Sequence, residues 1–202
     1  FFNIRRRYIG CKYKKSITVF GNTNFKRIFN IKYKNIYLNK KLFSSQTKNY
    51  VQKFVNLDKK SKSQIIEVHN RPSYIHIINS QVKNKFLTLY FHNDPLSMDG
   101  SKTVDQRIDL LKSCYKIIFN SSWSKKRFLE GLENKFINSN KLLIFYQSAK
   151  KSDLSVIKKK KKWITFVGKL NKAKGYDIFT KAIKKILNKY PEWKAMIIGD
   201  EK

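Results

Sequence analysis

The chain has 202 residues and a formal net charge of +32, with 45 lysines and arginines against 13 acidic residues. Only seven of the basic residues are arginine, and the 38 lysines occur with abundant Asn, Ile, Phe and Tyr, which share A/T-rich codons. Genome composition therefore explains much of the charge. An anionic membrane surface ranks above nucleic acid as a partner, because nucleic-acid sites favour arginine forks with interleaved aromatic residues and only Arg5–Tyr8 has that character.

Cysteine content and local motifs exclude several classes of protein. Cys11 and Cys114 are too few for a disulfide framework and lack metal-ligand spacing, which favours a reducing cytoplasm. No apolar run approaches the ~18 residues that a membrane-spanning helix needs. The sequence contains neither a Walker-type G-x-x-x-x-G-K-S/T motif nor G-x-G-x-x-G. It offers no defensible acid–base pair of carboxylates and no zinc spacing among its three histidines.

Short apolar, β-rich runs alternate with helical patterns along the chain. The predicted strands are Ile17–Phe20, Ile65–His69, Phe86–Phe91, Lys116–Phe119, Leu142–Phe145, Ile164–Val167 and Ala195–Ile198. This alternation predicts an α/β fold with parallel sheets and helices on both faces. Residues 21–64 have weak periodicity and support only a coarse interpretation.

Three helices have recognisable signals. Thr103 and Gln106 form a capping box ahead of apolar residues at helical spacing, and Ser122 is predicted to cap the next helix. The clearest helix is predicted over Tyr176–Tyr190, where the apolar residues fall on one face and Pro191 ends the pattern.

A polar stretch over Lys150–Lys162 separates two αβ blocks. We therefore predict two domains, residues 1–157 and residues 158–202, the first incomplete at its start. The run of five lysines at 158–162 is interpreted as a solvated linker, with a docking patch for anionic lipid heads as the alternative.

The segment Trp163–Asp177 carries the strongest functional signal. It reads as a buried strand, a basic loop flanked by Gly168 and Gly175, and a helix start. Lys169 and Lys174 flank the turn, where main-chain N–H groups and the helix dipole favour an anion. A phosphate site is predicted here, and the alternative is that both lysines are ordinary exposed loop residues. Gly199, which follows the last strand, is assigned to the same nucleotide side.

Polar residues also follow three strands of the first block. His69, Asn70 and Arg71 end the strand over Ile65–His69, His92 and Asn93 follow Phe86–Phe91, and Asn120 and Ser121 follow Lys116–Phe119. Open α/β sheets bind ligands at the carboxyl ends of their strands, so these residues are candidates for a binding site. The alternative for each histidine and asparagine is a structural role in its own turn, and Lys125–Arg127 are expected to form a solvated helix face.

The wording FVGKLNKAKGYDIF at residues 166–179 resembles the opening of the C-terminal domain in family 4 glycosyltransferases of the GT-B fold. The resemblance is good over residues 65–202 and weak over residues 1–64. It implies two Rossmann-like domains facing across a cleft, the second represented here by its first β-α-β unit. In that family the loop meets the diphosphate of a nucleotide-sugar donor, although many members have Arg where this chain has Lys169.

The resemblance also implies roles for the strand-end residues. A histidine at the position of His92 faces the transferred sugar in many relatives, which makes His92 the candidate catalytic residue. His69 and Asn70 would lie on the cleft floor beside it, and Arg71 would be available to a polar or phosphorylated acceptor. Asn93, Asn120 and Ser121 would line the acceptor side.

The implied reaction is transfer of a sugar from a nucleotide-diphosphate sugar to a carbohydrate or lipid-linked hydroxyl acceptor, with retained anomeric configuration and no metal or other cofactor. The implied setting is cell-envelope polysaccharide or glycolipid synthesis in the cytoplasm, with peripheral contact at the inner face of an anionic membrane. The family's paired glutamates would follow residue 202, so we expect this piece to be inactive alone. The alternative is a basic, non-catalytic binding module for nucleic acid or an anionic membrane surface.

Overall fold

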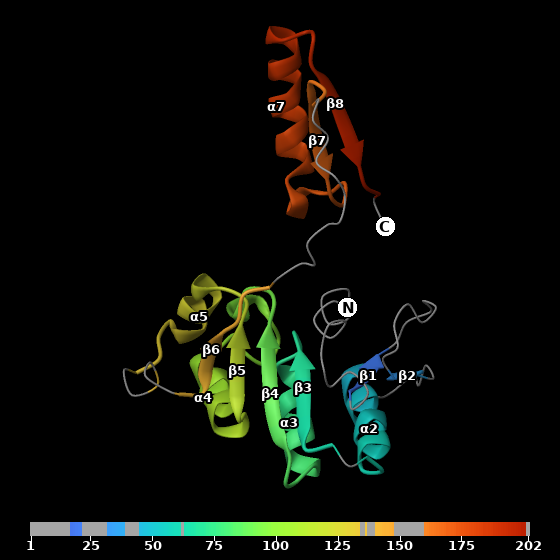
Figure 1. The fold of residues 1–202 in the computed structure, drawn as a ribbon. Coiled ribbons are helices and arrows are strands. Elements are labelled where there is room, and N and C mark those ends of the chain that lie inside the picture. Colours follow the sequence, from blue (N-terminus) through green and yellow to red (C-terminus); the bar gives the residue numbers. More distant parts are fainter. Residues whose placement is uncertain are drawn as a thin grey trace. The chain divides into compact units, whose positions relative to one another are not determined.

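The computed structural model describes residues 17–21, 32–38, 45–61, 63–133, 136, 140–147 and 160–200 (Figure 1). The chain divides into two compact units, Phe1–Lys150 and Lys151–Lys202. The predicted division after residue 157 falls in a segment outside the described ranges.

Unit 1 is built around a four-stranded parallel sheet. Its strands are β3 (Ile65–His69), β4 (Phe86–Phe91), β5 (Lys116–Phe119) and β6 (Leu142–Ile144), in that order across the sheet. All four strands were predicted, with β6 one residue shorter than expected. Their carboxyl ends lie at one edge of the sheet, where the arrowheads of Figure 1 point the same way.

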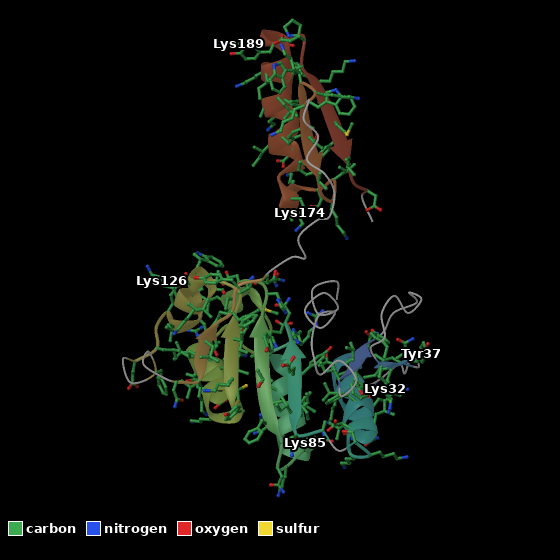
Figure 2. All side chains as sticks on the ribbon, in the orientation of Figure 1. Lys32, Tyr37, Lys85, Lys126, Lys174 and Lys189 are labelled. Carbon is green, nitrogen blue, oxygen red and sulfur yellow. The ribbon has the colours of Figure 1, made fainter. Side chains whose placement is uncertain are left out.

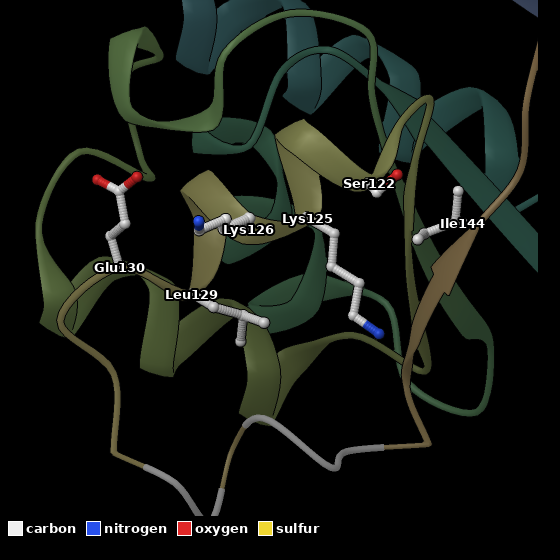
Figure 3. A pocket seen from close by; sticks show the side chains of 6 residues that line it. All are labelled: Ser122, Lys125, Lys126, Leu129, Glu130 and Ile144. Atoms are coloured by element: carbon white, nitrogen blue, oxygen red, sulfur yellow. The ribbon is translucent and has the colours of Figure 1, made fainter.

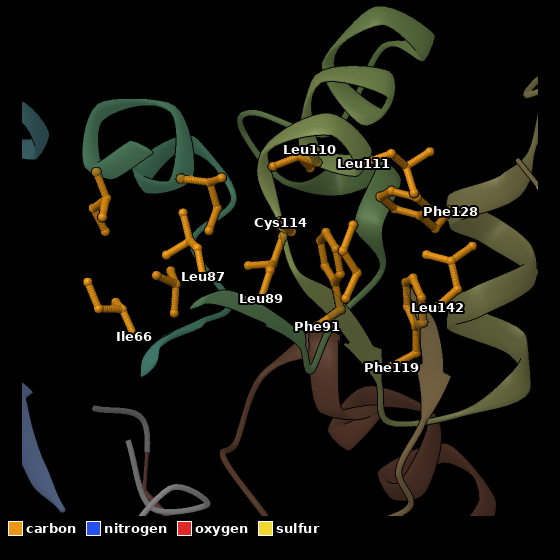
Figure 4. Packing of buried hydrophobic residues seen from close by; sticks show 14 of the residues in the cluster. Ile66, Leu87, Leu89, Phe91, Leu110, Leu111, Cys114, Phe119, Phe128 and Leu142 are labelled. Carbon is orange, nitrogen blue, oxygen red and sulfur yellow. The ribbon is translucent and has the colours of Figure 1, made fainter. Parts of the chain in front are cut away.

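The helices of unit 1 pack on one face of this sheet. They include α3 (Ser73–Gln81), α4 (Val104–Ser113) and α5 (Ser122–Leu129), with a short 3₁₀ turn, η2 (Pro95–Ser97), after β4. Because the strand order runs in one direction, right-handed crossovers bring the connecting helices to the same face. Figure 4 shows the resulting core around Leu89, Phe91, Phe119 and Phe128, all fully or almost fully buried.

The described helices lie on one face of the sheet, and the prediction of helices on both faces is seen for that face alone. Every helix from α2 to α5 contributes buried residues to one cluster, which contains Leu87 and Leu89 of β4 but not their neighbours Phe86 and Thr88. On the second face Ile65 is 58% exposed and Phe86 52%, whereas Thr88 and Tyr90 are each only 5% exposed. Among the described residues, helical cover is thus confined to one side, and Glu67, His69 and Tyr90 belong to the other.

Two helix starts can be compared with their sequence signals. The capping box of α4 is confirmed, since Thr103 Oγ1 accepts from Gln106 N (3.2 Å) and Gln106 Oε1 accepts from Thr103 N (3.3 Å). The predicted cap of α5 was wrong by one residue, because Ser121 Oγ accepts from Ser124 N and Ser122 is the first helical residue.

Three further elements of unit 1 were either not predicted or were predicted without their sheet partner. Strands β1 (Thr18–Gly21) and β2 (Lys32–Asn35) pair in parallel as a separate two-stranded sheet, so the described residues contain three sheets, one more than the one sheet per predicted domain. Helix α2 (Gln46–Asp58) adds Val51 and Val55 to the core. Its last residue, Asp58, is buried and pairs with Lys85 Nζ at 2.5 Å.

Unit 2 is a single β-α-β arrangement. It contains β7 (Trp163–Val167), a 3₁₀ turn η3 (Lys172–Lys174), α7 (Tyr176–Lys189) and β8 (Lys194–Ile198). The predicted parallel pairing of the two strands is confirmed, and α7 ends one residue before the predicted Tyr190. Phe166 contacts the rings of Tyr176 and Phe179, which holds the helix against one face of the sheet.

Lysine side chains project from the helices and strands of both units, as the labelled Lys32, Lys126 and Lys189 illustrate (Figure 2). No helix in the described ranges has the length and apolar character of a membrane span.

Candidate functional site

Two histidines meet at the carboxyl edge of the four-stranded sheet. His69 is the last residue of β3 and lies opposite Tyr90 in the register, and His92 follows β4 by one residue. Nδ1 of His69 and Nε2 of His92 are 3.0 Å apart, a hydrogen-bond distance. The His69 ring also stacks on Tyr90, with centroids 4.5 Å apart and planes 7° from parallel. The strand ends thus bring together the two histidines that the sequence singled out.

Two further side chains extend this pair at either end. Glu67 Oε2 lies 3.5 Å from His69 Nε2, and Tyr90 Oη donates to Glu67 Oε1 (3.3 Å). At the other end, Gln147 Nε2 lies 2.7 Å from His92 Nδ1. Sequence reasoning missed both partners. Glu67 could have been found, because residues two apart in a strand point to the same face as His69 does. Gln147 had no local signal.

Two asparagines hold the main chain of His92. Asn70 adopts a left-handed conformation (φ 58°), which asparagine tolerates better than most residues. Its N–H donates to Tyr90 O (2.8 Å), and its Oδ1 accepts from His92 N (3.2 Å). From the next strand end, Asn120 Nδ2 donates to His92 O (2.9 Å). Both amide side chains therefore fix the position of the His92 main chain.

The remaining acceptor-side candidates lie around this centre. Ser121 caps α5 and lies within hydrogen-bond distance of Asn120 Oδ1 (3.4 Å). Arg71 is exposed and turns back on its own loop, with Nη1 donating to Asn70 O (2.8 Å). Asn93 is exposed in the loop after β4. The structure therefore brings His69, Asn70, His92 and Asn120 into direct contact and leaves Arg71 and Asn93 at the surface.

The predicted donor loop lies in unit 2. Lys169 and Lys174 are both exposed, and η3 forms an extra turn between them that the sequence did not indicate. Gly175 has φ 72°, a left-handed conformation that favours glycine, and it directly precedes α7. Asp177 lies in the first turn of that helix, so its carboxylate lies at the same helix N-terminus where an anionic ligand is expected to bind.

Glycine has a steric cause at one of the predicted positions. A Cβ on Gly199 would lie 1.8 Å from Gly168 O, which no side chain could accommodate without main-chain movement. The close approach follows from the extension of the β7–β8 ladder, in which Gly168 N donates to Ile198 O and Leu170 N donates to Asp200 O, both at 3.0 Å. A Cβ on Gly168 would meet only ordinary contacts, the nearest being the Phe166 ring at 3.5 Å.

A separate shallow pocket lies on the surface of α5 and β6 (Figure 3). Its lining is Ser122, Lys125, Lys126, Leu129, Glu130 and Ile144. It contains none of the predicted site residues. The neighbouring Arg127, expected to be solvated, instead pairs with Asp94 and Glu130 (3.3 and 2.6 Å).

Within the described ranges, no three His, Cys, Asp or Glu side chains gather as a possible metal site. Cys114 is buried, and burial raises the pKa of its thiol to about 12. Cys11 lies outside the described residues.

Comparison with known proteins places these observations in context. Residues 147–202, which contain the donor loop, match the family model described as Glycosyl transferases group 1. No curated protein matches the chain. The structure is similar to a chain in the crystal structure of accessory secretory proteins 1, 2 and 3 of Streptococcus pneumoniae, with a TM-score of 0.50 and 12% sequence identity. That similarity covers 77% of this chain and 36% of the other, so the present chain spans only part of the length of its structural relative.

At this identity the structural likeness speaks to the fold alone. The fold is mixed α/β with parallel sheets, Rossmann-like and consistent with the GT-B type, which confirms the predicted fold class. The family match adds support for a glycosyltransferase, through the short segment that it covers.

Proposed function

We propose that this chain is part of a retaining, family 4 glycosyltransferase that transfers a sugar from a nucleotide-diphosphate sugar to a carbohydrate or lipid-linked hydroxyl acceptor. The observation that carries the proposal is the match of residues 147–202 to the Glycosyl transferases group 1 model, because this segment includes the loop from Gly168 to Gly175. The contacts of the histidine pair in unit 1 add a second, independent argument.

The donor diphosphate would bind at the loop of unit 2. Lys169 and Lys174 are exposed and available to an anionic ligand, and the N-terminus of α7 adds main-chain N–H groups and its dipole. Gly175 lets the main chain turn and Gly199 lets it approach Gly168 closely here. In this proposal lysine charges neutralise the diphosphate and no metal or other cofactor takes part. Transfer by the complete protein should therefore survive a chelator.

The sugar and acceptor would meet the strand ends of unit 1. His92 would contact the transferred sugar, and Asn70 and Asn120 would fix its main chain at the measured distances of 3.2 and 2.9 Å. A displacement of about 1 Å can cost catalysis a factor of about a hundred, so such fixing matters for a residue that contacts the reacting centre. Arg71 and Asn93, both exposed, would be available to the acceptor.

We further propose a cytoplasmic location with peripheral contact at an anionic membrane, as glycolipid or envelope polysaccharide synthesis would require. The net charge of +32 supports this contact. So does the surface of α5 and the β6 end, where Trp123 is 58% exposed close in sequence to Lys125 and Lys126. Phe145, 56% exposed, follows Ile144, which lines a pocket with the same two lysines. Sedimentation with anionic and neutral vesicles tests it, and equal binding to both would contradict the electrostatic contact.

The decisive experiment measures nucleotide-sugar binding by the complete protein. Lys169→Ala and Lys174→Ala should each weaken binding by about ten- to a hundredfold, the worth of a hydrogen bond to a charged group. Lys169→Arg should be tolerated, because it restores a bidentate fork. Lys184→Ala is the matched control, since Lys184 is an equally exposed lysine on α7 and should leave affinity unchanged.

His92→Ala should act differently from the lysine variants. Its proposed partners are the sugar and the acceptor, so turnover should fall more than nucleotide affinity. If both lysine variants bind the donor like the parent, the phosphate role is wrong. Affinity for nucleic acid or vesicles that falls steeply with salt and ignores UDP and GDP would favour the alternative of a basic binding module.

A further inference from the structure

Four side chains form a continuous line across the carboxyl edge of the unit 1 sheet. Glu67 contacts His69 Nε2, His69 Nδ1 contacts His92 Nε2, and His92 Nδ1 contacts Gln147 Nε2, at 3.5, 3.0 and 2.7 Å. Each nitrogen of both imidazoles therefore has a partner, and each contact needs one hydrogen.

The chemistry at the two ends sets the direction of the hydrogen bonds between them. The Glu67 carboxylate is 3.5 Å from His69 Nε2, longer than an ordinary hydrogen bond, but its negative charge beside that nitrogen favours the His69 proton on Nε2. Nδ1 of a neutral His69 then accepts, which requires His92 to carry its proton on Nε2. Nδ1 of a neutral His92 accepts in turn, and the NH₂ group of Gln147 can only donate. The carboxylate at one end and the amide nitrogen at the other agree on the same arrangement.

We propose that Glu67 and His69 are positioning residues that hold neutral His92 in the Nε2–H tautomer and so present Nδ1 as a hydrogen-bond acceptor. Gln147 donates to that acceptor, at the place where a ligand hydroxyl group would donate. This inference rests on the proposed function for the identity of the ligand as a sugar or acceptor hydroxyl, but the assignment of the tautomer does not.

The fold accounts for the arrangement at each step. Glu67 and His69 are two residues apart in β3 and so point to the same face. The His69 side chain is only 9% exposed, and its ring stacks on Tyr90 and lies 5.3 Å from the ring of His92 in a near-parallel arrangement. A ring held in this way cannot easily rotate to exchange its two nitrogens.

The test is an NMR measurement on the full chain with ¹⁵N-labelled histidine, at about pH 8.5, well above the ordinary imidazole pKa. The sequence has three histidines, and His76, exposed on α3, is the internal reference for an unconstrained ring. His92 should show a protonated nitrogen at Nε2 and an unprotonated one at Nδ1. The opposite tautomer, or tautomer-averaged signals like those expected of His76, would overturn the proposal without any variant.

Variants then test the source of the tautomer. In a Gln147→Ala background, which removes the donor at His92 Nδ1, His69→Phe keeps a ring to stack on Tyr90 but removes the acceptor, and Glu67→Ala removes the carboxylate; both should move His92 toward averaged signals. Glu67→Gln retains an accepting oxygen and should rescue the parent tautomer. Asp109→Asn, at an exposed carboxylate on α4, is the matched control. An unchanged His92 tautomer in both disruptive variants would contradict the positioning role.

Activity of the complete protein separates this inference from the proposed function. Glu67→Ala and His69→Phe should lower turnover by about tenfold or more while the KM for the donor changes little, because the diphosphate is proposed to bind in unit 2. The predicted tautomer in a protein that binds no nucleotide sugar would refute the function and leave the positioning intact. Transfer activity with an averaged His92 would refute the positioning alone.

Discussion

The sheets of the two units are made of similar strands but differ in how far they are covered. In β4 every residue after Phe86 is buried, whereas in β8 every residue except Met196 is exposed. Both strands are largely apolar, a composition typical of parallel strands that are covered on both faces. The apolar composition of a strand therefore indicates that it is suited to packing on both faces. Its burial shows how much of that packing the described residues provide.

Energetic consequences follow from that difference. The core of unit 1 draws on α2 to α5 and all four strands of its sheet, but among residues 160–200 of unit 2 only Ile183 of α7 is buried. Val167 and Ile198, paired in register, remain 72% and 51% exposed. Since the hydrophobic contribution scales with apolar area removed from water, unit 2 as described should be much less stable than unit 1.

The largest expected effect is in the core of unit 1. Phe119→Ala removes a fully buried ring that packs against Phe91 and Phe128, and it should lower the free energy of unfolding by about 3–5 kcal/mol. Ile198→Ala, at a half-exposed position of β8, should cost well under that amount. Urea unfolding followed by circular dichroism measures both. Equal costs would show that unit 2 has an apolar core as complete as that of unit 1.

The second prediction uses the reactivity of a buried thiol as a probe of the same difference. Burial raises the pKa of Cys114 from 9.0 to about 12, so at pH 9 its thiolate fraction is lower by about five hundredfold than that of an ordinary thiol. In a Cys11→Ser background, iodoacetamide should therefore label Cys114 about five hundredfold more slowly than a cysteine introduced by Ile198→Cys.

The pH dependence of stability follows from the same shift. Between about pH 9 and 12 the unfolded chain has lost the thiol proton while the native chain retains it, so this group makes stability fall as the pH rises through that window. Labelling of Cys114 as fast as that of the introduced cysteine would mean that the core around α4 opens readily.

The third prediction concerns the close main-chain approach in unit 2. Gly199→Ala should destabilise the β7–β8 pairing by about 1–3 kcal/mol, because its Cβ would overlap Gly168 O. Gly168→Ala is the matched control and should cost much less, since its Cβ has room. Amide hydrogen exchange of Gly168 and Leu170, whose N–H groups span the junction, reports the effect directly. Similar protection in both variants would contradict the steric explanation.

Sequence patterns correctly predicted the strands and helices that have a local signal of their own. The bounds of β3, β4 and β5 matched because each is a short apolar run with turn residues on both sides. The elements within residues 21–64 were not predicted. The sequence of β2, KYKN, has no apolar alternation, and the pairing of β1 with β2 is a tertiary contact. The placement of the described helices on one face of the main sheet was also not predictable, because it depends on the order of strands and not on any one of them.

The candidate site was predictable to a similar extent. The strand-end rule located His69, Asn70, His92 and Asn120, since parallel strands end at the same edge. It did not distinguish which of them serve the loop itself, and the structure assigns main-chain contacts with His92 to both asparagines. Gln147 follows β6 and reaches His92 across 55 positions of sequence, a contact that no local pattern encodes.

The smallest expected effect compares how the two units begin their best-defined helices. Helix α4 starts with the reciprocal hydrogen bonds of Thr103 and Gln106, whereas α7 starts at Gly175 without a side-chain cap. Thr103→Ala leaves Gln106 N without its cap and should lower the stability of unit 1 by about 1 kcal/mol, while Thr103→Ser keeps the hydroxyl and should cost little. Thermal unfolding of the full chain, read at the transition of unit 1, measures the difference. Because α4 packs through Leu110 and Leu111 on the core, the loss should appear in the cooperative transition and not only as fraying of the first turn. A loss confined to hydrogen exchange near residue 106, with no shift of the transition, would show that this helix start is uncoupled from the core that distinguishes unit 1 from unit 2.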